Sequence, residues 1–406
     1  MHFMPILSSL RRHRTAAALI AIEIALTCAI VCNAIFLVGD RLARMDQPSG
    51  IVEDELVRVR LAGIGKDRTD ASALTNQDLN ALRAIPGVKS TASADQVPFA
   101  NSSWNSDVST IPDDPAPPVN GAMYVGSADL LETLGVTLTA GRDFTPDEYI
   151  EFDAMQTSTA HMPSVIITRG IAERLFPGKS PLGQPVYIWG KEPQIVVGVI
   201  DRLARPNNVK PGAQDYAFVL PVFVPYTIGG TYLLRVAPDR RAEVIAAIDA
   251  TLNKVDPSRI ISDRTTFTEI RKEFFRQDRS MAGLLVGVCA ALLVVTALGV
   301  IGLASFWVQQ RTRQIGTRRA LGATRRDIVR YFQTENFILA TIGIIIGMAL
   351  AYAINLWLMD KYQVGRLPAV FLPFGALLLW GLGQIAVLGP ALRAASIPPA
   401  IATRSV

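Results

Sequence analysis

Residues 281–308 read MAGLLVGVCAALLVVTALGVIGLASFWV, a run of 28 residues that contains no Asp, Glu, Lys or Arg. A helix needs about 20 mostly apolar residues to cross the hydrocarbon core of a bilayer, so this run is long enough to span one. Three further runs share this character, and only the first of them holds a charged residue, Glu23: 15–38, 337–359 and 369–392. The last three of the four runs fall within 112 residues, which is not typical of the core helices of a soluble protein. The sequence therefore predicts a membrane protein with four transmembrane α-helices in a 1+3 arrangement.

The first run has two interpretations, because it follows Arg11, Arg12 and Arg14 and could be a secretory signal peptide. Its apolar stretch is longer than the roughly 7–15 residues that are usual in such peptides. No convincing small-residue cleavage site follows it in the sequence. We therefore expect an uncleaved membrane anchor at 15–38.

Lysine and arginine between the runs predict the orientation, since short basic loops stay on the cytoplasmic side of a membrane. The segment 309–336 carries seven arginines, whereas the short turn between the third and fourth runs holds only Lys361 and Arg366. Basic residues also precede the first run and follow the fourth. Both termini and 309–336 are therefore expected in the cytoplasm, and the 242 residues of 39–280 outside it.

The formal net charge of +5 could indicate a nucleic-acid-binding protein, but the charges are unevenly placed. The outer segment 39–280 holds 26 basic and 31 acidic residues, a net charge of −5, so the basic surplus lies in the cytoplasmic parts. Membrane orientation alone explains that surplus. No nucleic-acid partner is predicted.

The outer segment is predicted to be a large α+β domain inserted between the first and second spans. It contains no cysteine, so its fold must be held by core burial rather than by disulfides. Sequence periodicity predicts strands at 56–61, 88–94, 232–236 and 259–262, with helices at 76–84 and 240–253. Because these units bracket the segment, we expect one subdomain from 51–94 and 231–264.

The middle of the outer segment, 95–230, differs from its two ends in composition and in the pattern of its expected elements, and it is predicted to form a second, inserted subdomain. A stretch rich in Ser, Asp and Pro at 101–120 is typical of a loop. Strands are expected at 122–125, 164–168, 194–199 and 218–224. The pattern Thr266-x-x-Glu269 then predicts the start of a helix, and 265–280 is expected to be a stalk that continues directly into the second span.

Motifs for enzyme chemistry are incomplete in this sequence. Pro177-Gly178-Lys179-Ser180 ends like a phosphate-binding loop, but Glu173 stands where the first glycine is required. The three histidines are scattered, and neither G-x-S-x-G nor H-E-x-x-H occurs. No catalytic residue, metal site or cofactor is therefore predicted for this chain. The three cysteines, which lie within the apolar runs, are interpreted as packing residues: Cys28, Cys32 and Cys289.

The cytoplasmic segment 309–336 is predicted to form a helical hairpin. The helix of the second span can continue through Leu321, Gly322 suits its end, and Thr324-x-x-Asp327 suits the start of the next helix. The tip between them, 320–323, is small and apolar and is flanked by arginines. Composition leaves two interpretations open: a docking surface for a cytoplasmic partner, or an ordinary basic loop lying on lipid headgroups.

Two further features bear on the membrane. Glu23 lies about two turns inside the first span, where it could contact another helix, contact a substrate, or extend toward the interface. Apolar residues before Arg11 predict an interfacial helix over 1–14, and 393–406 is expected to be a cytoplasmic tail.

Several segments resemble one family. The strongest is 310–328, QRTRQIGTRRALGATRRDI, followed by Pro390-x-x-Arg393-Ala394 with Pro398 or Pro399 near the end. In the outer segment the similar stretches are 131–144, which includes 134–135 and 140–144, and 175–178, 181–183 and 196–199. With its order of one anchor, a large outer domain and three helices, the chain resembles the MacB/FtsX-like family of ABC transporter permeases.

The resemblance implies a permease in the bacterial inner membrane that is not itself an ATPase and pairs with a separate ABC ATPase subunit, which binds ATP and Mg. It implies a dimer with a second permease, a periplasmic adaptor and an outer-membrane channel. In the family the loop between the second and third spans contacts the ATPase, which here assigns the contact to Arg313, Ile315, Gly316, Thr317, Arg318, Arg319, Ala320, Leu321, Gly322, Ala323, Thr324 and Arg325. Gln314 stands where the family usually has Glu, which removes a negative charge.

The function implied is export or efflux of peptides, antibiotics or lipid-linked cargo, driven by conformational change passed to the periplasmic domain. Two alternatives remain open at this point. One is a lipoprotein-release subunit, and the other is a regulatory protein that moves no cargo and controls a periplasmic partner. The large outer segment resembles the efflux type of domain, which favours export.

Overall fold

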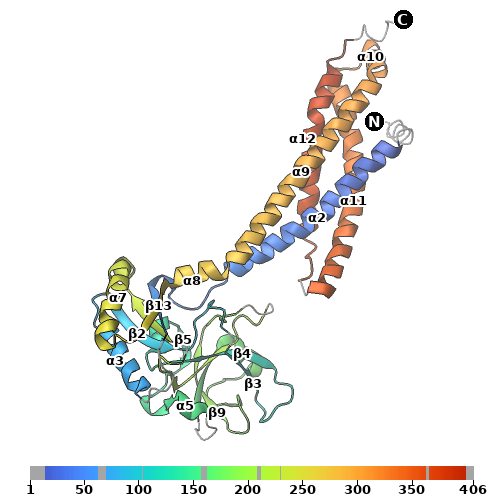
Figure 1. The fold of residues 1–406 in the computed structure, drawn as a ribbon. Coiled ribbons are helices and arrows are strands. Elements are labelled where there is room, and N and C mark those ends of the chain that lie inside the picture. The colour runs from blue at the N-terminus through green and yellow to red at the C-terminus, as the bar shows by residue number, and fades with distance from the viewer. Residues whose placement is uncertain are drawn as a thin grey trace. The chain divides into compact units, whose positions relative to one another are not determined.

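The structure is a computed structural model, and it describes residues 14–62, 70–102, 104–156, 162–207, 212–228, 230–362 and 365–398. The chain divides into a helical unit, Met1–Asp46 with Gln277–Val406, and a mixed unit, Gln47–Arg276. Within the described residues, four helices are long and apolar enough to cross a membrane, and the mixed unit is α+β (Figure 1). The predicted fold class is therefore confirmed. The predicted interfacial helix before Arg14 and the end of the predicted tail, 399–406, lie outside the described residues.

The helical unit is built around α11, which packs along both α2 and α12. The four long helices are α2 (Arg14–Met45), α9 (Arg276–Gln310), α11 (Arg325–Tyr362) and α12 (Phe371–Ala395). Two glycines allow α2 to approach α11 closely: a Cβ on Gly343 would lie 2.8 Å from the Ala21 carbonyl oxygen, and one on Gly347 would lie 2.5 Å from the Cβ of Cys28. Cys28 and Cys32 are fully buried small packing side chains: Cys28 faces the Ile344 carbonyl oxygen of α11, and the Cys32 sulfur lies 2.4 Å from the position that a Cβ on Gly375 of α12 would take.

Helix α9 joins its neighbours through a few polar contacts and through apolar side chains that include Val300, Ala304 and Trp307. Only 11% of the residues in the most apolar 18-residue stretch of α9 are buried, against 67% in the corresponding stretch of α2. Thr27 and Thr296 share a hydrogen bond of 2.8 Å between their hydroxyls. Near the C-terminal end of α2, Arg41 donates to Asp278 at 2.5 Å. Much of the apolar surface of α9 is therefore open to lipid or to another protein.

The first sheet of the mixed unit joins the two ends of that unit. Its antiparallel order is β13-β1-β12-β2, with bounds β1 (Leu56–Ala62), β2 (Val88–Ala94), β12 (Thr231–Val236) and β13 (Ile260–Thr266). Helices α3 (Ala71–Arg83) and α7 (Arg241–Val255) share one hydrophobic core with the sheet. Helix α3 begins five residues earlier than predicted, because the buried Ala71 and Leu74 continue its apolar face by one turn.

The second sheet has seven strands in the order β3-β4-β10-β7-β9-β5, with β8 paired to β9. Its strands are β3 (Asn105–Val108), β4 (Val119–Val125), β5 (Leu138–Gly141), β7 (Ser164–Thr168), β8 (Pro185–Val186), β9 (Gln194–Ile200) and β10 (Ala217–Leu220). A separate pair consists of β6 (Ile150–Glu151) and β11 (Val222–Phe223). Short helices complete the unit: α4 (Leu130–Leu134), α5 (Phe152–Gln156), α6 (Arg169–Leu175), and 3-10 turns at Glu53–Glu55, Pro146–Glu148 and Pro238–Arg240.

Two predictions for this subdomain are wrong in detail. The expected loop at 101–120 contains β3, which pairs with β4 as an edge strand. The expected strand at 218–224 is divided at Pro221, which has no N–H to donate to a sheet. The chain therefore leaves the seven-stranded sheet after β10 and joins β6 as β11.

The predicted stalk is also divided. Thr266 and Glu269 form the expected capping box, with the Thr266 amide donating to the Glu269 carboxylate at 2.9 Å, and α8 (Phe267–Phe274) follows. The helix then breaks at Phe275 before α9 begins. Phe274 and Phe275 both pack against Phe99, with ring centroids 5.2 Å away. Neighbouring residues of one helix point about 100° apart, so a continuous rod would not bury both rings there.

Asp95, which follows β2, is a buried acid in the mixed unit. Its Oδ1 accepts a hydrogen bond from the Val125 amide at 3.1 Å, while Oδ2 has no partner among the described residues. Burial raises the pKa of Asp95 to about 8. An unfolded Asp has a pKa of about 3.9, so between these values the folded chain holds a proton that the unfolded chain releases. The free energy of unfolding contributed by Asp95 therefore falls as pH rises from about 4 to about 8.

Replacing Asp95 by Asn should remove this pH dependence while keeping the acceptor for Val125. We expect Asp95→Asn to raise the thermal unfolding midpoint of the mixed unit at pH 8 and to have little effect at pH 4. The exposed acid Asp239, changed to Asn, serves as the control for loss of a negative charge. Equal shifts at both pH values would contradict the assignment.

Candidate functional site

The hairpin between α9 and α11 is the candidate functional site. Helix α10 (Thr312–Ala320) forms its first arm, and the start of α11 forms the second. Gly322 has a φ of +98°, a left-handed conformation that glycine adopts without strain. The Ala323 amide donates to the Arg318 carbonyl at 3.1 Å, and the Gly322 amide donates to the Arg319 carbonyl at 3.1 Å. This pair of bonds is the Schellman helix ending, which fixes the turn at the tip.

The second arm of the hairpin is capped as firmly as the first. The amide and hydroxyl of Thr324 donate to the Asp327 carboxylate at 2.9 and 2.6 Å. The Asp327 amide donates back to the Thr324 hydroxyl at 3.2 Å. These bonds lower the pKa of Asp327, led by the bond from the hydroxyl. Both helix ends that the sequence predicted are thus present, and the turn between them is well defined.

The tip presents an exposed leucine among exposed arginines. Leu321 is 83% exposed, which is the largest value among the large apolar side chains of the described residues. Arg318 is also exposed, and its guanidinium lies 4.8 Å from the centre of the Tyr331 ring. The other exposed cations here are Arg313, Arg325, Arg326 and Arg330. The hairpin therefore offers one apolar contact surrounded by positive charge.

Other residues of the predicted contact segment instead support the hairpin from inside. Ile315 and Gly316 are buried, and Ile315 packs in an apolar cluster with Ile328 and Phe332. Arg319 donates 2.9 Å bonds to the carbonyl oxygens of Ala395 and Ile397, at the end of α12. That end lies beside α10 (Figure 1). The predicted segment thus has two parts. Its tip is exposed, whereas Ile315, Gly316 and Arg319 support the hairpin from inside and form what we call its root.

Two features at the root were missed by the sequence reasoning. The helix of the second span does not continue to Leu321, because it breaks at Arg311, whose φ of −104° and ψ of 10° depart from helical values. Arg311 instead forms a buried ion pair with Glu335. One sequence feature could have indicated this ion pair: Glu335 is an acidic residue at the membrane end of a strongly basic loop.

Glu23 lies away from the hairpin, in the contact between α2 and α9. Both of its carboxylate oxygens lie 2.6 Å from the position that a Cβ on Gly299 would take. The side chain therefore fills a notch that the glycine leaves open. Of the three interpretations offered by the sequence, the structure corresponds to a contact with another membrane helix.

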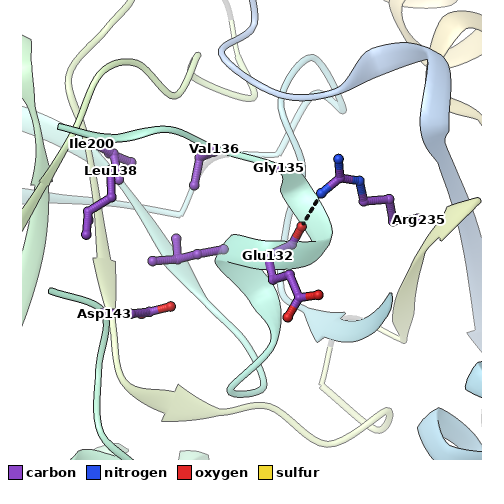
Figure 2. Close-up of a pocket in the computed structure, with 8 residues that line it drawn as sticks. Glu132, Gly135, Val136, Leu138, Asp143, Ile200 and Arg235 are labelled. Atoms are coloured by element: carbon purple, nitrogen blue, oxygen red, sulfur yellow. Dashed lines mark hydrogen bonds between the residues drawn. The ribbon is translucent and has the colours of Figure 1, made fainter. Parts of the chain in front are cut away.

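The mixed unit contains a separate hollow of about 310 Å³, shown in Figure 2. It is lined by both apolar and acidic side chains: Leu131, Glu132, Val136, Leu138, Asp143 and Ile200, with Gly135 and Arg235. Arg235 donates to the Glu132 carbonyl oxygen at 3.2 Å and also pairs with Glu55 at 2.6 Å. Partial burial raises the pKa of Asp143. Among the described residues, no group of three His, Cys, Asp or Glu side chains could hold a metal ion.

Family models match most of the chain. Residues 15–253 match the MacB-like periplasmic core domain, and residues 286–399 match the FtsX-like permease C-terminal region. The first match covers α2 and most of the mixed unit, and the second covers most of α9 together with α10, α11 and α12.

Individual relatives agree with these matches. The macrolide export ATP-binding/permease protein MacB of Azoarcus sp. is 30% identical over 271 residues, which are 63% of this chain and 39% of that protein. MacB of Bdellovibrio bacteriovorus is 27% identical over 378 residues, 87% of this chain and 51% of that protein. The pyoverdine export ATP-binding/permease protein PvdT of Pseudomonas entomophila is 30% identical over 256 residues, 59% of this chain and 38% of that protein. The chain thus spans between 38% and 51% of the length of these relatives.

Proposed function

The chain belongs to the family of permeases with a MacB-like periplasmic core and an FtsX-like C-terminal region, and from this premise we propose that it is the membrane subunit of an ABC exporter. In this proposal a separate ATPase subunit binds ATP and Mg and docks on the α9–α11 hairpin. The observation that carries the proposal is the 83% exposure of Leu321 at the tip of a rigid, capped turn.

Physical chemistry favours a protein partner at this tip over lipid headgroups alone. Exposed basic residues are explained by membrane orientation, but a rigidly presented leucine is not. An apolar anchor surrounded by cations is typical of the centre and rim of a protein interface. The partner surface should therefore have an apolar pocket with acidic residues around it.

The direction of transport and the further partners follow as part of the same proposal. Relatives are named as exporters of macrolides and of pyoverdine, which supports an efflux role in the inner membrane. We propose that ATP-driven movement of the hairpin is passed through the helical unit to the periplasmic unit. A second permease, identical or paralogous, completes the dimer, and a periplasmic adaptor and outer-membrane channel carry cargo onward.

Charge reversal at the rim of the tip tests the docking proposal. The chain is purified with candidate ATPase subunits, and retention of the ATPase and its rate of ATP hydrolysis are measured. We expect Arg318→Glu to weaken retention on the order of tenfold, mostly through slower association, with retention also falling as salt rises. Lys254→Glu, an exposed charge reversal on α7, should have no effect. Equal retention by Arg318→Glu and wild type would count against a docking surface at this position.

A further inference from the structure

The break between α9 and α10 is built into the structure rather than being a frayed helix end. The Thr312 hydroxyl lies 3.0 Å from the Val308 carbonyl oxygen and 2.9 Å from that of Gln309. It can therefore donate a hydrogen bond to the carbonyl groups that the last turn of α9 leaves without a helical partner. The Arg311 amide still donates to the Trp307 carbonyl at 3.1 Å. The backbone therefore changes direction at Arg311 while its polar groups stay satisfied.

A buried ion pair lies at this break. The Arg311 guanidinium donates to both carboxylate oxygens of Glu335, at 3.1 and 2.9 Å. The two side chains are only 10% and 1% exposed. The same guanidinium lies 5.5 Å from the centre of the Trp307 ring. Arg311 thus ties the break to α11 and to the last turns of α9.

Two further polar groups close to this pair have no partner within the described residues. They are the indole Nε1 of Trp307 and the amide Nδ2 of Asn336, and both side chains are 5% exposed. Both residues line, together with Glu335, a small hollow of about 10 Å³ whose other walls are apolar. A buried donor without an acceptor is costly. A cavity of roughly 10–15 Å³ with two or more polar partners is large enough for one water molecule.

We propose that Arg311, Glu335, Trp307 and Asn336 form a polar node that holds one water, and that this node positions the hairpin relative to α9 and α11. The water oxygen accepts from Trp307 Nε1 and Asn336 Nδ2, and one of its hydrogens is donated to the Glu335 carboxylate. The inference rests on the proposed function, since it assigns the node to coupling: the tip binds the ATPase, and the node passes the movement of the tip to the membrane helices.

The chemistry of the node suits this role better than apolar packing would. Apolar contacts are non-directional, so a hairpin held only by Ile315 and its neighbours could shift without a defined path. Nη1 of Arg311 donates to both carboxylate oxygens of Glu335, and because charge-assisted hydrogen bonds are short and directional, this pair restricts both the distance and the orientation of the two side chains. Loss of the pair should therefore leave the tip able to bind and reduce the transmission of its movement.

The coupling half of the inference is tested with Glu335→Gln and Arg311→Lys in the full chain with its ATPase. Both variants should retain the ATPase as wild type does, while the permease-dependent change in ATP hydrolysis falls on the order of tenfold. Asp360→Asn, an exposed acid at the other end of α11, is the matched control and should behave as wild type. Unchanged coupling in both node variants would overturn the inference. Loss of ATPase retention in both would also overturn it, because the pair would then act in docking.

The water is tested by thermal unfolding of a chain in which Trp307 is replaced by benzothienylalanine, whose two fused rings have nearly the shape of indole but carry a sulfur in place of the N–H donor. If the hollow holds a water, this variant loses a hydrogen bond and its unfolding midpoint falls. If the hollow is dry, the variant removes an unsatisfied donor, and a midpoint that is equal or higher overturns the water assignment. The unfolding midpoints are measured without the ATPase, so they test the water even if the ATPase binds elsewhere on the chain. Binding of the ATPase elsewhere would contradict the proposed function and not the water assignment.

Discussion

Replacing Leu321 by Glu is expected to abolish stable binding of the ATPase to this chain. Anchor residues at the centre of an interface commonly contribute 2 kcal/mol or more, roughly a thirtyfold change in affinity. A glutamate adds the cost of placing a charge in the apolar pocket that receives the leucine. We therefore expect a loss of about 3 kcal/mol or more, on the order of a hundredfold, measured as ATPase retained on the purified permease.

The same substitution should leave the chain folded. Leu321 is 83% exposed and makes no contribution to the buried cluster at the root of the hairpin, so its replacement costs little stability. Ile260→Glu is the matched control, because Ile260 is an exposed apolar residue, 54% exposed, on the mixed unit. Retention of the ATPase by both variants at the wild-type level would refute the assignment of the tip.

Replacing Asp78 by Ala is expected to cause the largest loss of stability in the mixed unit. Arg259 donates to both carboxylate oxygens of Asp78, one bond measuring 2.8 Å, and the two side chains are 2% and 0% exposed. The Tyr232 hydroxyl donates to the same carboxylate at 2.7 Å. Removing Asp78 leaves the Arg259 charge buried without its main acceptor. Breaking a buried pair in this way typically costs about 3 to 5 kcal/mol.

Hydrogen exchange of the full chain measures this loss where it occurs. Amides of α3, β1 and β12 should exchange faster in Asp78→Ala, because these elements share one hydrophobic core and Asp78 lies on α3, which packs in it. The matched control is Asp263→Ala, which removes an acid paired to Arg58 at 2.7 Å but 36% exposed. A partly exposed pair contributes about 1 kcal/mol or less. Equal protection in the two variants would contradict the ranking of the pairs.

The elements that the sequence predicted well are those with a strong repeating pattern. The four apolar runs have a length and composition that few soluble helices share, and each corresponds to a long helix. In the mixed unit, alternation in 56–61 predicted β1, and the apolar stretch 232–236 predicted β12, because each strand buries one or both faces. The caps at Thr266 and Thr324 were predicted from short motifs whose bonds involve residues only three apart.

The features that were missed depend on contacts between distant residues. Strand β3 lies in a polar stretch and exists because β4 offers it an edge. The break at Phe275 follows from packing against Phe99, which is far away in the sequence. At the hairpin, the sequence placed the caps and the exposed tip correctly but treated the whole segment as surface. The pairing of Arg311 with Glu335, 24 residues later, decides which residues belong to the root.

Site-directed cross-linking from position 321 in intact membranes tests the central claim most directly. A photo-reactive amino acid replaces Leu321, and the same amino acid at Ile260 on the mixed unit serves as the control. If the hairpin is the docking site, position 321 forms a cross-linked product with an ATP-binding protein that carries a complete phosphate-binding loop, and position 260 does not. Cross-links from 321 to lipid alone, with no ATP-binding protein recovered, would contradict the account.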